Sequence, residues 1–124
     1  MKFTAICENH LYSKAYSKGK RAVTSALAVY VLPDLAAKRL AKSHPQKKIV
    51  NRIGLTVSKK LGPAVVRSRT KRILREGMRE AVRTAPIKTG YLIVIAARER
   101  AVTVKSQVIA RDLVRAFKKL ELTV

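Results

Sequence analysis

A strand followed at once by a long helix, each with one apolar side, most constrains the fold of this 124-residue chain. From Arg52 to Ser58 apolar and polar residues alternate, which is the pattern of a β-strand with one buried and one open face. Residues 63–83 then repeat apolar residues at helical spacing, and Pro63 suits the first turn of a helix. Gly77 lies on the apolar stripe, where glycine costs about 1 kcal/mol relative to alanine, so we expect close packing of this helix against the sheet.

Hydrophobic patterning places further elements on both sides of this pair. It predicts a helix at 8–18, strands at 22–32 and 91–97, and a final amphipathic helix at 105–120. Residues 33–48 form a polar connection between two of the strands. We therefore expect one α+β domain over residues 1–124, in which helices pack on a sheet in the order helix, two strands, helix, strand, helix.

Positive charge dominates the composition. The chain carries 28 Lys and Arg against 7 Asp and Glu, a formal net charge of +21. Charge of this density destabilises a compact chain unless a polyanion neutralises it, and lysine and arginine gain binding free energy by releasing counterions from nucleic-acid phosphates. A membrane surface is the alternative, but no segment combines a basic face with a broad apolar face bearing exposed aromatic residues. The composition therefore predicts a nucleic-acid-binding protein without distinguishing RNA from DNA.

Short apolar runs and a single cysteine indicate the compartment. The uninterrupted apolar runs, 26–32 and 91–97, fall well short of the about 20 residues that cross a bilayer. Glu8 interrupts the N-terminal apolar residues too early for a secretory signal. Cys7 has no partner for a disulfide, which suits a reducing environment. We therefore expect a soluble protein of the cytoplasm.

No arrangement of residues indicates catalysis by the protein. His10 and His44 stand in polar segments, without cysteine or histidine at metal-binding spacing. Glu76 and Glu80 lie four residues apart among arginines, so they are better interpreted as ion-pair partners than as an acid–base pair. The sequence also lacks a Ser/His/Asp arrangement and a glycine-rich phosphate loop. It therefore predicts no catalytic residue and no metal or cofactor bound by the protein.

The densest charge lies in the first half of the helix predicted at 63–83. Four of the six residues from Arg67 to Arg72 are basic, with no acidic residue among them. Arginine can hold a phosphate group through two parallel hydrogen bonds, and several arginines on one helix can do so together. A charge run is usually only a solvated face, but this density favours binding to a nucleic-acid backbone.

Residues 54–76 resemble the signature of the protein subunit of bacterial ribonuclease P. That signature reads Gly-Leu-x-Val-Ser-Lys-Lys-x-Gly and then Ala-Val-x-Arg-Asn-Arg-x-Lys-Arg-x-x-Arg-Glu, and it appears here without gaps as Gly54–Gly62 and Ala64–Glu76. Two positions depart from the family pattern: Ser68 replaces the central Asn, and Pro63 stands where Asn is usual. Serine offers one hydroxyl in place of a two-ended amide, so we expect Ser68 to perform the role of that Asn less well.

The resemblance implies a fold and a function. The fold is a mainly four-stranded sheet packed by helices, with a left-handed strand–helix–strand crossover where general rules favour the right-handed form. In this family the RNA subunit performs the hydrolysis with Mg²⁺ held by the RNA. The protein, one copy per catalytic RNA, binds that RNA and the single-stranded 5′ leader of precursor tRNA. It would thus be the non-catalytic subunit of an endoribonuclease.

The resemblance also implies two sets of binding residues. The leader-binding set combines three of the four tyrosines with polar residues: Tyr12, Tyr16, Tyr30, Arg52, Thr56, Ser58, Lys59 and Lys60. The catalytic-RNA-binding set is Arg67, Ser68, Arg69, Lys71, Arg72 and Arg75. Without the resemblance, tyrosines at 12 and 16 would serve equally well as half-buried packing residues.

Two other functions fit the size and charge. One is a structural RNA-binding protein of the ribosomal type, with no substrate. The other is a DNA-architectural protein, although the sequence shows no helix–turn–helix pattern. The unbroken signature together with the tyrosines favours the ribonuclease P subunit.

Overall fold

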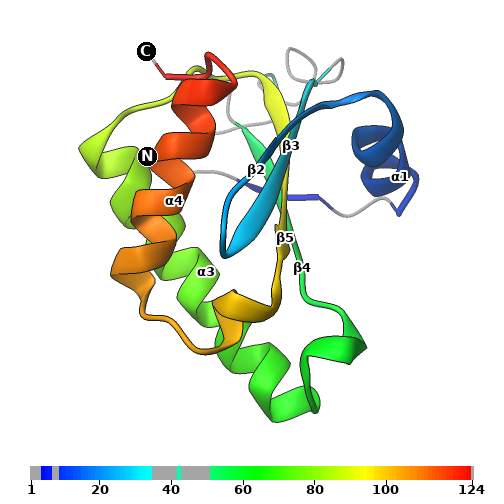
Figure 1. Cartoon of the computed structure of the whole chain (residues 1–124). Helices are drawn as coiled ribbons and strands as arrows, with labels where there is room; N and C mark the ends of the chain where they lie inside the picture. Colours follow the sequence, from blue (N-terminus) through cyan, green and yellow to red (C-terminus); the bar gives the residue numbers. More distant parts are fainter. Residues whose placement is uncertain (1–3, 7–8, 35–41, 43–50, 124) are drawn as a thin grey trace.

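A mixed β-sheet runs through the molecule, with two long helices on one face and a short helix on the other (Figure 1). This computed structural model describes residues 4–6, 9–34, 42 and 51–123. Most of the polar connection expected at 33–48 lies outside the described residues, as do Cys7 and His44.

The sheet has the strand order β1–β4–β5–β3–β2. Its strands are β1 (Thr4–Ala5), β2 (Lys20–Val23), β3 (Leu27–Pro33), β4 (Arg52–Thr56) and β5 (Tyr91–Ala97). The central strands β4 and β5 are parallel, β3 is antiparallel to both β5 and β2, and the two-residue β1 pairs in parallel with β4 at the far edge. The predicted α+β class is confirmed, with four main strands and one very short one.

The segment predicted as one strand at 22–32 is two strands. The chain turns between β2 and β3, which then pair as an antiparallel hairpin. The turn contains Ser25 but no glycine, proline, asparagine or aspartate. The Thr24 amide donates to the Leu27 backbone oxygen at 2.8 Å and closes the turn locally, and distant side chains add to this contact. The Asp112 carboxylate accepts hydrogen bonds from the Ala26 amide at 3.2 Å and the Ser25 hydroxyl at 3.3 Å. A local pattern cannot reveal a turn that tertiary contacts stabilise.

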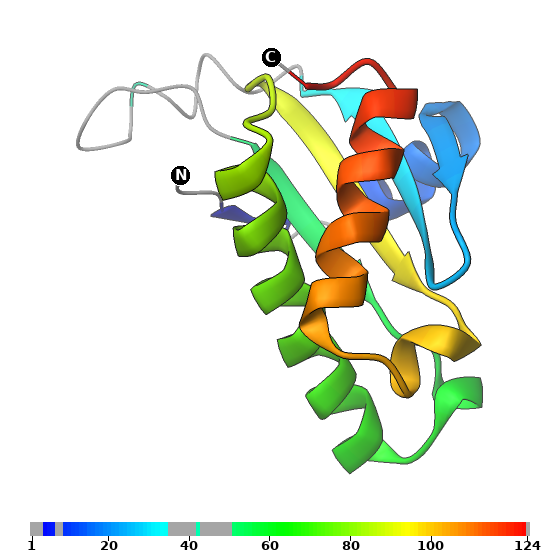
Figure 2. The same ribbon diagram turned by 60° about the vertical axis from the view of Figure 1, so that its left-hand side comes forward.

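Two helices, α3 (Ala64–Thr84) and α4 (Ser106–Lys119), pack side by side over one face of the sheet (Figures 1 and 2). They agree with the predicted helices to within one or two residues. A Cβ atom added at Gly77 would lie 2.5 Å from Cγ2 of Ile109, so this glycine permits the close approach of the two helices. The expected close packing at Gly77 is present, but its partner is α4 and not the sheet.

The connection from β4 through α3 to β5 is left-handed. In Figure 2 helix α3 lies in front of the sheet, β4 and β5 both run downward, and β5 lies to the right of β4. Nearly all parallel connections of this kind are right-handed, so this crossover departs from the general rule. It agrees with the fold that the family resemblance implies.

The sheet separates two hydrophobic cores. The larger lies under α3 and α4, and its largest fully buried side chains include Leu27, Leu74, Ile93, Leu113 and Phe117. The smaller one lies under helix α1 (Asn9–Lys18) and contains Ile6, Ala15, Leu92 and Val94, with Tyr12 and Tyr30 packed against it. Because side chains alternate along a strand, β3 and β5 contribute to both cores. The smaller core thereby brings tyrosines from α1 and β3 together.

None of the helices among the described residues has the length and apolar character needed to cross a membrane.

Candidate nucleic-acid interface

The three tyrosines of the predicted leader-binding set meet on the face of the sheet that α1 covers. The ring centroids of Tyr16 and Tyr30 lie 4.8 Å apart with an interplanar angle of 87°, an edge-to-face contact. The hydroxyl of Tyr16 also lies 3.0 Å from Oγ1 of Thr56 on β4. The Tyr12 ring lies over Gly54, where an added Cβ would come within 2.5 Å of the tyrosine hydroxyl oxygen. We call Tyr12, Tyr16, Tyr30 and Thr56 the tyrosine cluster.

Exposure differs among the rings of the cluster. Tyr16 is 42% exposed, whereas Tyr12 and Tyr30 are half-buried against the smaller core. The tyrosines therefore pack the fold and also present aromatic surface to solvent. The packing interpretation is confirmed for Tyr12 and Tyr30, and RNA binding by these rings stays a prediction, since an aromatic ring can pack with one side and remain open on the other.

Arg21 belongs to this face and was missed from the sequence. It pairs directly with Tyr30 in the β2–β3 hairpin, and it is exposed. Paired residues in adjacent strands project to the same face, so the Arg21 side chain lies beside the Tyr30 ring. The only signal available was the basic residue before the predicted strand at 22–32, and that signal does not reveal the hairpin partner.

Arg52 does not have the exposed position that leader binding requires. Its Nε donates to Oδ2 of Asp34 at 2.7 Å, and a terminal nitrogen of its guanidinium donates to Oδ1 at 2.9 Å. The two side chains are only 9% and 2% exposed. The pair links the start of β4 to the residue that follows β3, across β5. The structure thus corrects the sequence-based assignment: the guanidinium lies in a buried ion pair.

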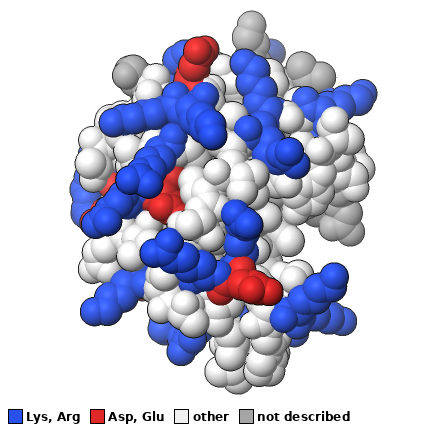
Figure 3. All heavy atoms as spheres, in the orientation of Figure 1, with Lys and Arg blue, Asp and Glu red and all other residues white. Residues whose placement is uncertain are grey.

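Ser58, Lys59 and Lys60 follow β4 and are all exposed. The lysines open the short 3-10 helix η1 (Lys59–Leu61), which begins directly after Ser58. In Figure 3 the surface is indented between the part formed by α1 and the basic side chains over η1. These residues therefore place positive charge at the end of the strand that carries Thr56.

The catalytic-RNA-binding set lies entirely on α3. Ser68, Arg69, Arg72 and Arg75 are exposed and, with Ala64 and Val65, line a shallow hollow of about 690 Å³. Arg67 and Lys71 are half-buried, one helical turn apart. The buried Nε of Arg67 has no hydrogen-bond partner. The helix therefore gathers the six predicted residues around its N-terminal half.

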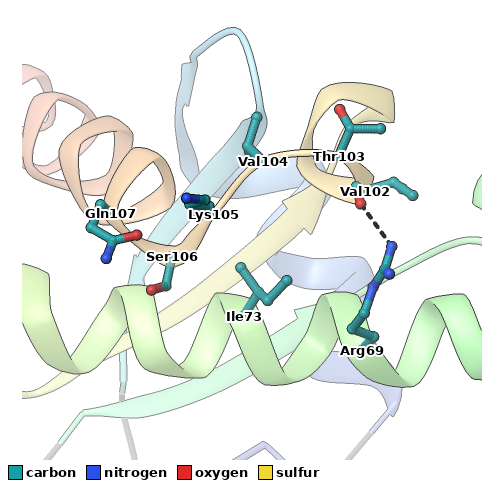
Figure 4. Close-up of a pocket in the computed structure, with 8 residues that line it drawn as sticks. All are labelled: Arg69, Ile73, Val102, Thr103, Val104, Lys105, Ser106 and Gln107. Carbon is teal, nitrogen blue, oxygen red and sulfur yellow. Dashed lines mark hydrogen bonds between the residues drawn. The ribbon is translucent and has the colours of Figure 1, made fainter.

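A groove of about 600 Å³ separates α3 from the segment that joins the 3-10 helix η2 (Glu99–Val102) to α4 (Figure 4). Arg69 crosses one end of this groove and donates to the backbone oxygen of Val102 at 3.2 Å. This contact fixes one guanidinium nitrogen of Arg69 and holds its side chain toward η2. Arg69 is thus partly preorganised, at an exposed position beside Arg72.

Comparison with known proteins decides the family. The sequence profile of the family described as Ribonuclease P matches residues 2–121. The chain belongs to the ribonuclease P protein family. The ribonuclease P protein component of Alkaliphilus oremlandii is 32% identical over 115 residues, covering 93% of this chain and 89% of the relative. That of Clostridium acetobutylicum is 37% identical over 98 residues, covering 79% of this chain and 72% of the relative.

Solved ribonuclease P proteins have the same fold. The structure of the Staphylococcus aureus protein matches with a TM-score of 0.72 at 27% identity, covering 99% of this chain and 100% of that one. The Thermotoga maritima protein, at 19% identity, shares the fold with a TM-score of 0.68, covering 90% of this chain and 92% of that one.

As a ribonuclease P protein, the chain is a subunit of an RNA-catalysed endoribonuclease of tRNA processing and associates with ribonuclease P RNA. This membership favours the predicted subunit over the ribosomal-type and DNA-architectural alternatives. Among the residues that the structure describes, no three His, Cys, Asp or Glu side chains gather in a way that could hold a metal ion.

Proposed function

We propose that this ribonuclease P protein is one RNA-binding domain that holds the 5′ leader of precursor tRNA at the tyrosine cluster while α3 holds the catalytic RNA. The observation that supports the leader site most strongly is the convergence of three tyrosines from α1 and β3 beside Thr56. One protein would serve one catalytic RNA.

The chemistry of the tyrosine cluster suits an unpaired strand. An aromatic ring stacks on a base for about 1–3 kcal/mol, and every base offers a face for stacking. The hydrogen bond and the ring contact of Tyr16 hold its ring before the RNA arrives, which lowers the entropy lost on binding. The exposed cations Arg21, Lys59 and Lys60 are available for the phosphates of the same strand. Such a site accepts leaders of different sequence.

The two RNA sites are joined by a short stretch of chain. Thr56 of the tyrosine cluster and Arg67 of α3 are separated by the end of β4, η1 and the first turn of α3. The protein would therefore hold the leader and the catalytic RNA in a fixed relation, so that the scissile phosphate lies at the metal ions of the RNA. Its cations would also reduce the repulsion between the two polyanions. The protein itself supplies binding and position, and no bond-breaking group.

Leader-dependent binding tests this function. The dissociation constant of the assembled holoenzyme is measured for precursor tRNA and for the same tRNA without a leader. Replacing Tyr12→Ala or Tyr30→Ala should weaken precursor binding at least about fivefold, as expected for the loss of one stacking contact, and leave binding of the leader-free tRNA nearly unchanged. Equal losses for both RNAs would contradict a leader site.

The fourth tyrosine provides a matched control. Tyr91 is half-buried and packs against the larger core, on the side of the sheet covered by α3 and α4. Tyr91→Ala should lower the melting temperature without changing the ratio of the two dissociation constants. A second measurement is 5′ cleavage at low Mg²⁺ by ribonuclease P RNA, which the wild-type protein should stimulate; cleavage by the protein without any RNA subunit would overturn the proposal.

A further inference from the structure

The outward side of α4 carries a second basic surface. Of the exposed residues on this helix, one is Gln107 and the other four are cations: Arg111, Arg115, Lys118 and Lys119. The one acidic residue of α4, Asp112, is buried and accepts hydrogen bonds from the turn of the β2–β3 hairpin. Lys and Arg side chains gather over α4 in Figure 3. We call the four cations the α4 surface.

The fold does not account for all of these cations. Lys118 and Lys119 lie in the last turn, where positive charge interacts favourably with the helix dipole. Arg111 and Arg115 lie further from the end and gain little from it. None of the four forms an ion pair with another described residue. Four unneutralised cations on one helix repel one another, and a polyanion would relieve that repulsion.

The spacing of the α4 surface suits a phosphate backbone. Arg111, Arg115 and Lys119 follow one another every fourth residue, so they lie along one side of the helix at steps of about 6 Å. A notch of about 250 Å³ lies between α4 and the hairpin turn, and it is lined by Arg115, Lys119, Asp112, Ala116, Val23, Thr24 and Ser25. The carboxylate of Asp112 in this notch accepts hydrogen bonds from the Ser25 hydroxyl and the Ala26 amide. A strand lying along α4 would thus meet a row of cations beside a recess.

Two acidic side chains of α3 follow the cations of its N-terminal half along the helix. Arg69 and Ile73 line the groove between α3 and the start of α4, and Gly77 touches Ile109 of α4. The helical repeat therefore places Glu76 and Glu80 on the same flank of α3, between Arg69 and the level of the α4 surface. Neither glutamate forms an ion pair with another described residue, in contrast to the sequence-based interpretation. A strand crossing from α3 to α4 would meet these carboxylates. The two basic surfaces are therefore suited to separate RNA segments.

We propose that the α4 surface binds the phosphodiester backbone of an RNA segment other than the one held by the N-terminal half of α3. Because α4 and α1 cover opposite faces of the sheet, this segment is also distinct from the leader. Ribonuclease P RNA and the body of the tRNA present the same backbone chemistry, and the experiment distinguishes them. This inference goes beyond the leader site and does not depend on it.

The salt dependence of binding tests the proposal. Each phosphate contact contributes about 0.7–0.9 to the slope of log K against log salt concentration. The test variant carries Arg111→Gln, Arg115→Gln and Lys119→Gln. The matched control removes three other exposed cations through Arg79→Gln, Arg83→Gln and Lys88→Gln. Slopes are measured for protein binding to ribonuclease P RNA alone and for leader-free tRNA binding to the assembled holoenzyme.

We expect the test variant to reduce the slope by about 2 to 3 in one of the two measurements, and the control variant to reduce it by less than about 1. A reduction with ribonuclease P RNA alone assigns the segment to that RNA, and a reduction only with tRNA assigns it to the substrate. Unchanged slopes in both measurements, or an equal reduction in the control, would overturn the proposal.

Two further measurements separate charge from folding and from the leader site. The variant Arg111→Lys with Arg115→Lys keeps both charges and should keep the wild-type slope. The ratio of dissociation constants for precursor and leader-free tRNA should stay at its wild-type value in the Gln variant. A change in that ratio alone would attribute the effect to the leader site and count against a separate α4 surface.

Discussion

The hydroxyl of Tyr16 lies 3.0 Å from Oγ1 of Thr56, and this hydrogen bond ties α1 to the central strand β4. The same tyrosine ring meets Tyr30 of β3 edge to face at 4.8 Å. Two contacts to different strands thus fix the angle of the most exposed ring in the tyrosine cluster. Of these two contacts, the hydrogen bond can be removed without removing the ring.

Removing that hydrogen bond should loosen the ring. A hydrogen bond of this kind contributes about 0.5–1.5 kcal/mol, so Tyr16→Phe and Thr56→Val should each weaken precursor binding about two- to tenfold. The double variant should lose little more than either single variant, because both remove the same interaction. Binding of leader-free tRNA serves as the control. Additive losses in the double variant would show that the two residues act separately.

Gly54 leaves space for the ring of Tyr12, and filling that space should displace the ring. In Gly54→Ala the new Cβ would lie 2.5 Å from the Tyr12 hydroxyl oxygen and from Cε1, so the ring has to move. The ring is the end of a flexible side chain, so the free energy of unfolding should change little. Leader-dependent binding should fall by up to the about 1–3 kcal/mol of one stacking contact. Urea unfolding and precursor binding measure the two effects.

Gly77→Ala is the matched control for Gly54→Ala, because it also replaces a closely packed glycine but lies away from the tyrosine cluster. Here the new Cβ would lie 2.5 Å from Cγ2 of Ile109 and 3.2 Å from the backbone nitrogen of Ala110, so α4 would have to shift. We expect an overpacking cost of about 1–3 kcal/mol, which exceeds the about 1 kcal/mol gained in helix propensity. In Gly77→Ala we expect a lower free energy of unfolding and an unchanged ratio of the dissociation constants for precursor and leader-free tRNA. This result would show that the two glycines have different roles.

The alternation around β4 predicted the face of each side chain but not the burial of Arg52. Thr56 belongs to the tyrosine cluster, on the face predicted to be open in this strand, and Ile53 lies in the larger core. Arg52 follows the same alternation, yet its guanidinium is buried because Asp34, 18 residues earlier, lies within 2.7 Å. Nothing in the local pattern indicates that pair, because it forms across an intervening strand.

Breaking the buried pair should destabilise the protein. Removing one partner of a buried ion pair costs about 3–5 kcal/mol, because the other charge stays buried without compensation. Arg52→Gln should therefore lower the free energy of unfolding by about this amount in urea titrations. The exposed control Lys59→Gln should change stability by less than about 0.5 kcal/mol and weaken precursor binding. Normal stability with a selective loss of leader binding in Arg52→Gln would restore the sequence-based assignment.

The β2–β3 hairpin shows why part of the candidate site could not be predicted. The predicted continuous strand followed from the alternation of side chains along residues 22–32, and the turn from Thr24 to Ala26 has no glycine, proline, asparagine or aspartate to interrupt that pattern. Besides the local hydrogen bonds between Thr24 and Leu27, its contacts come from Asp112 and from Arg98, whose guanidinium donates to the backbone oxygen of Thr24 at 2.7 Å. These partners lie more than 70 residues away. The hairpin then places Arg21 opposite Tyr30, which no sequence pattern indicated.

Arg21 and its neighbour Lys20 allow a matched test of this placement. Both are exposed cations on β2, but Arg21 shares the face of Tyr30, whereas Lys20 pairs with Val31 of the larger core and shares the opposite face. Arg21→Gln should remove one phosphate contact and reduce the salt slope of precursor binding by about 0.7 relative to leader-free tRNA. Lys20→Gln removes the same charge, but it should leave the difference in salt slope between precursor tRNA and leader-free tRNA at its wild-type value. Equal effects of the two substitutions would show that only net charge matters, and that the face shared with Tyr30 does not contact the leader.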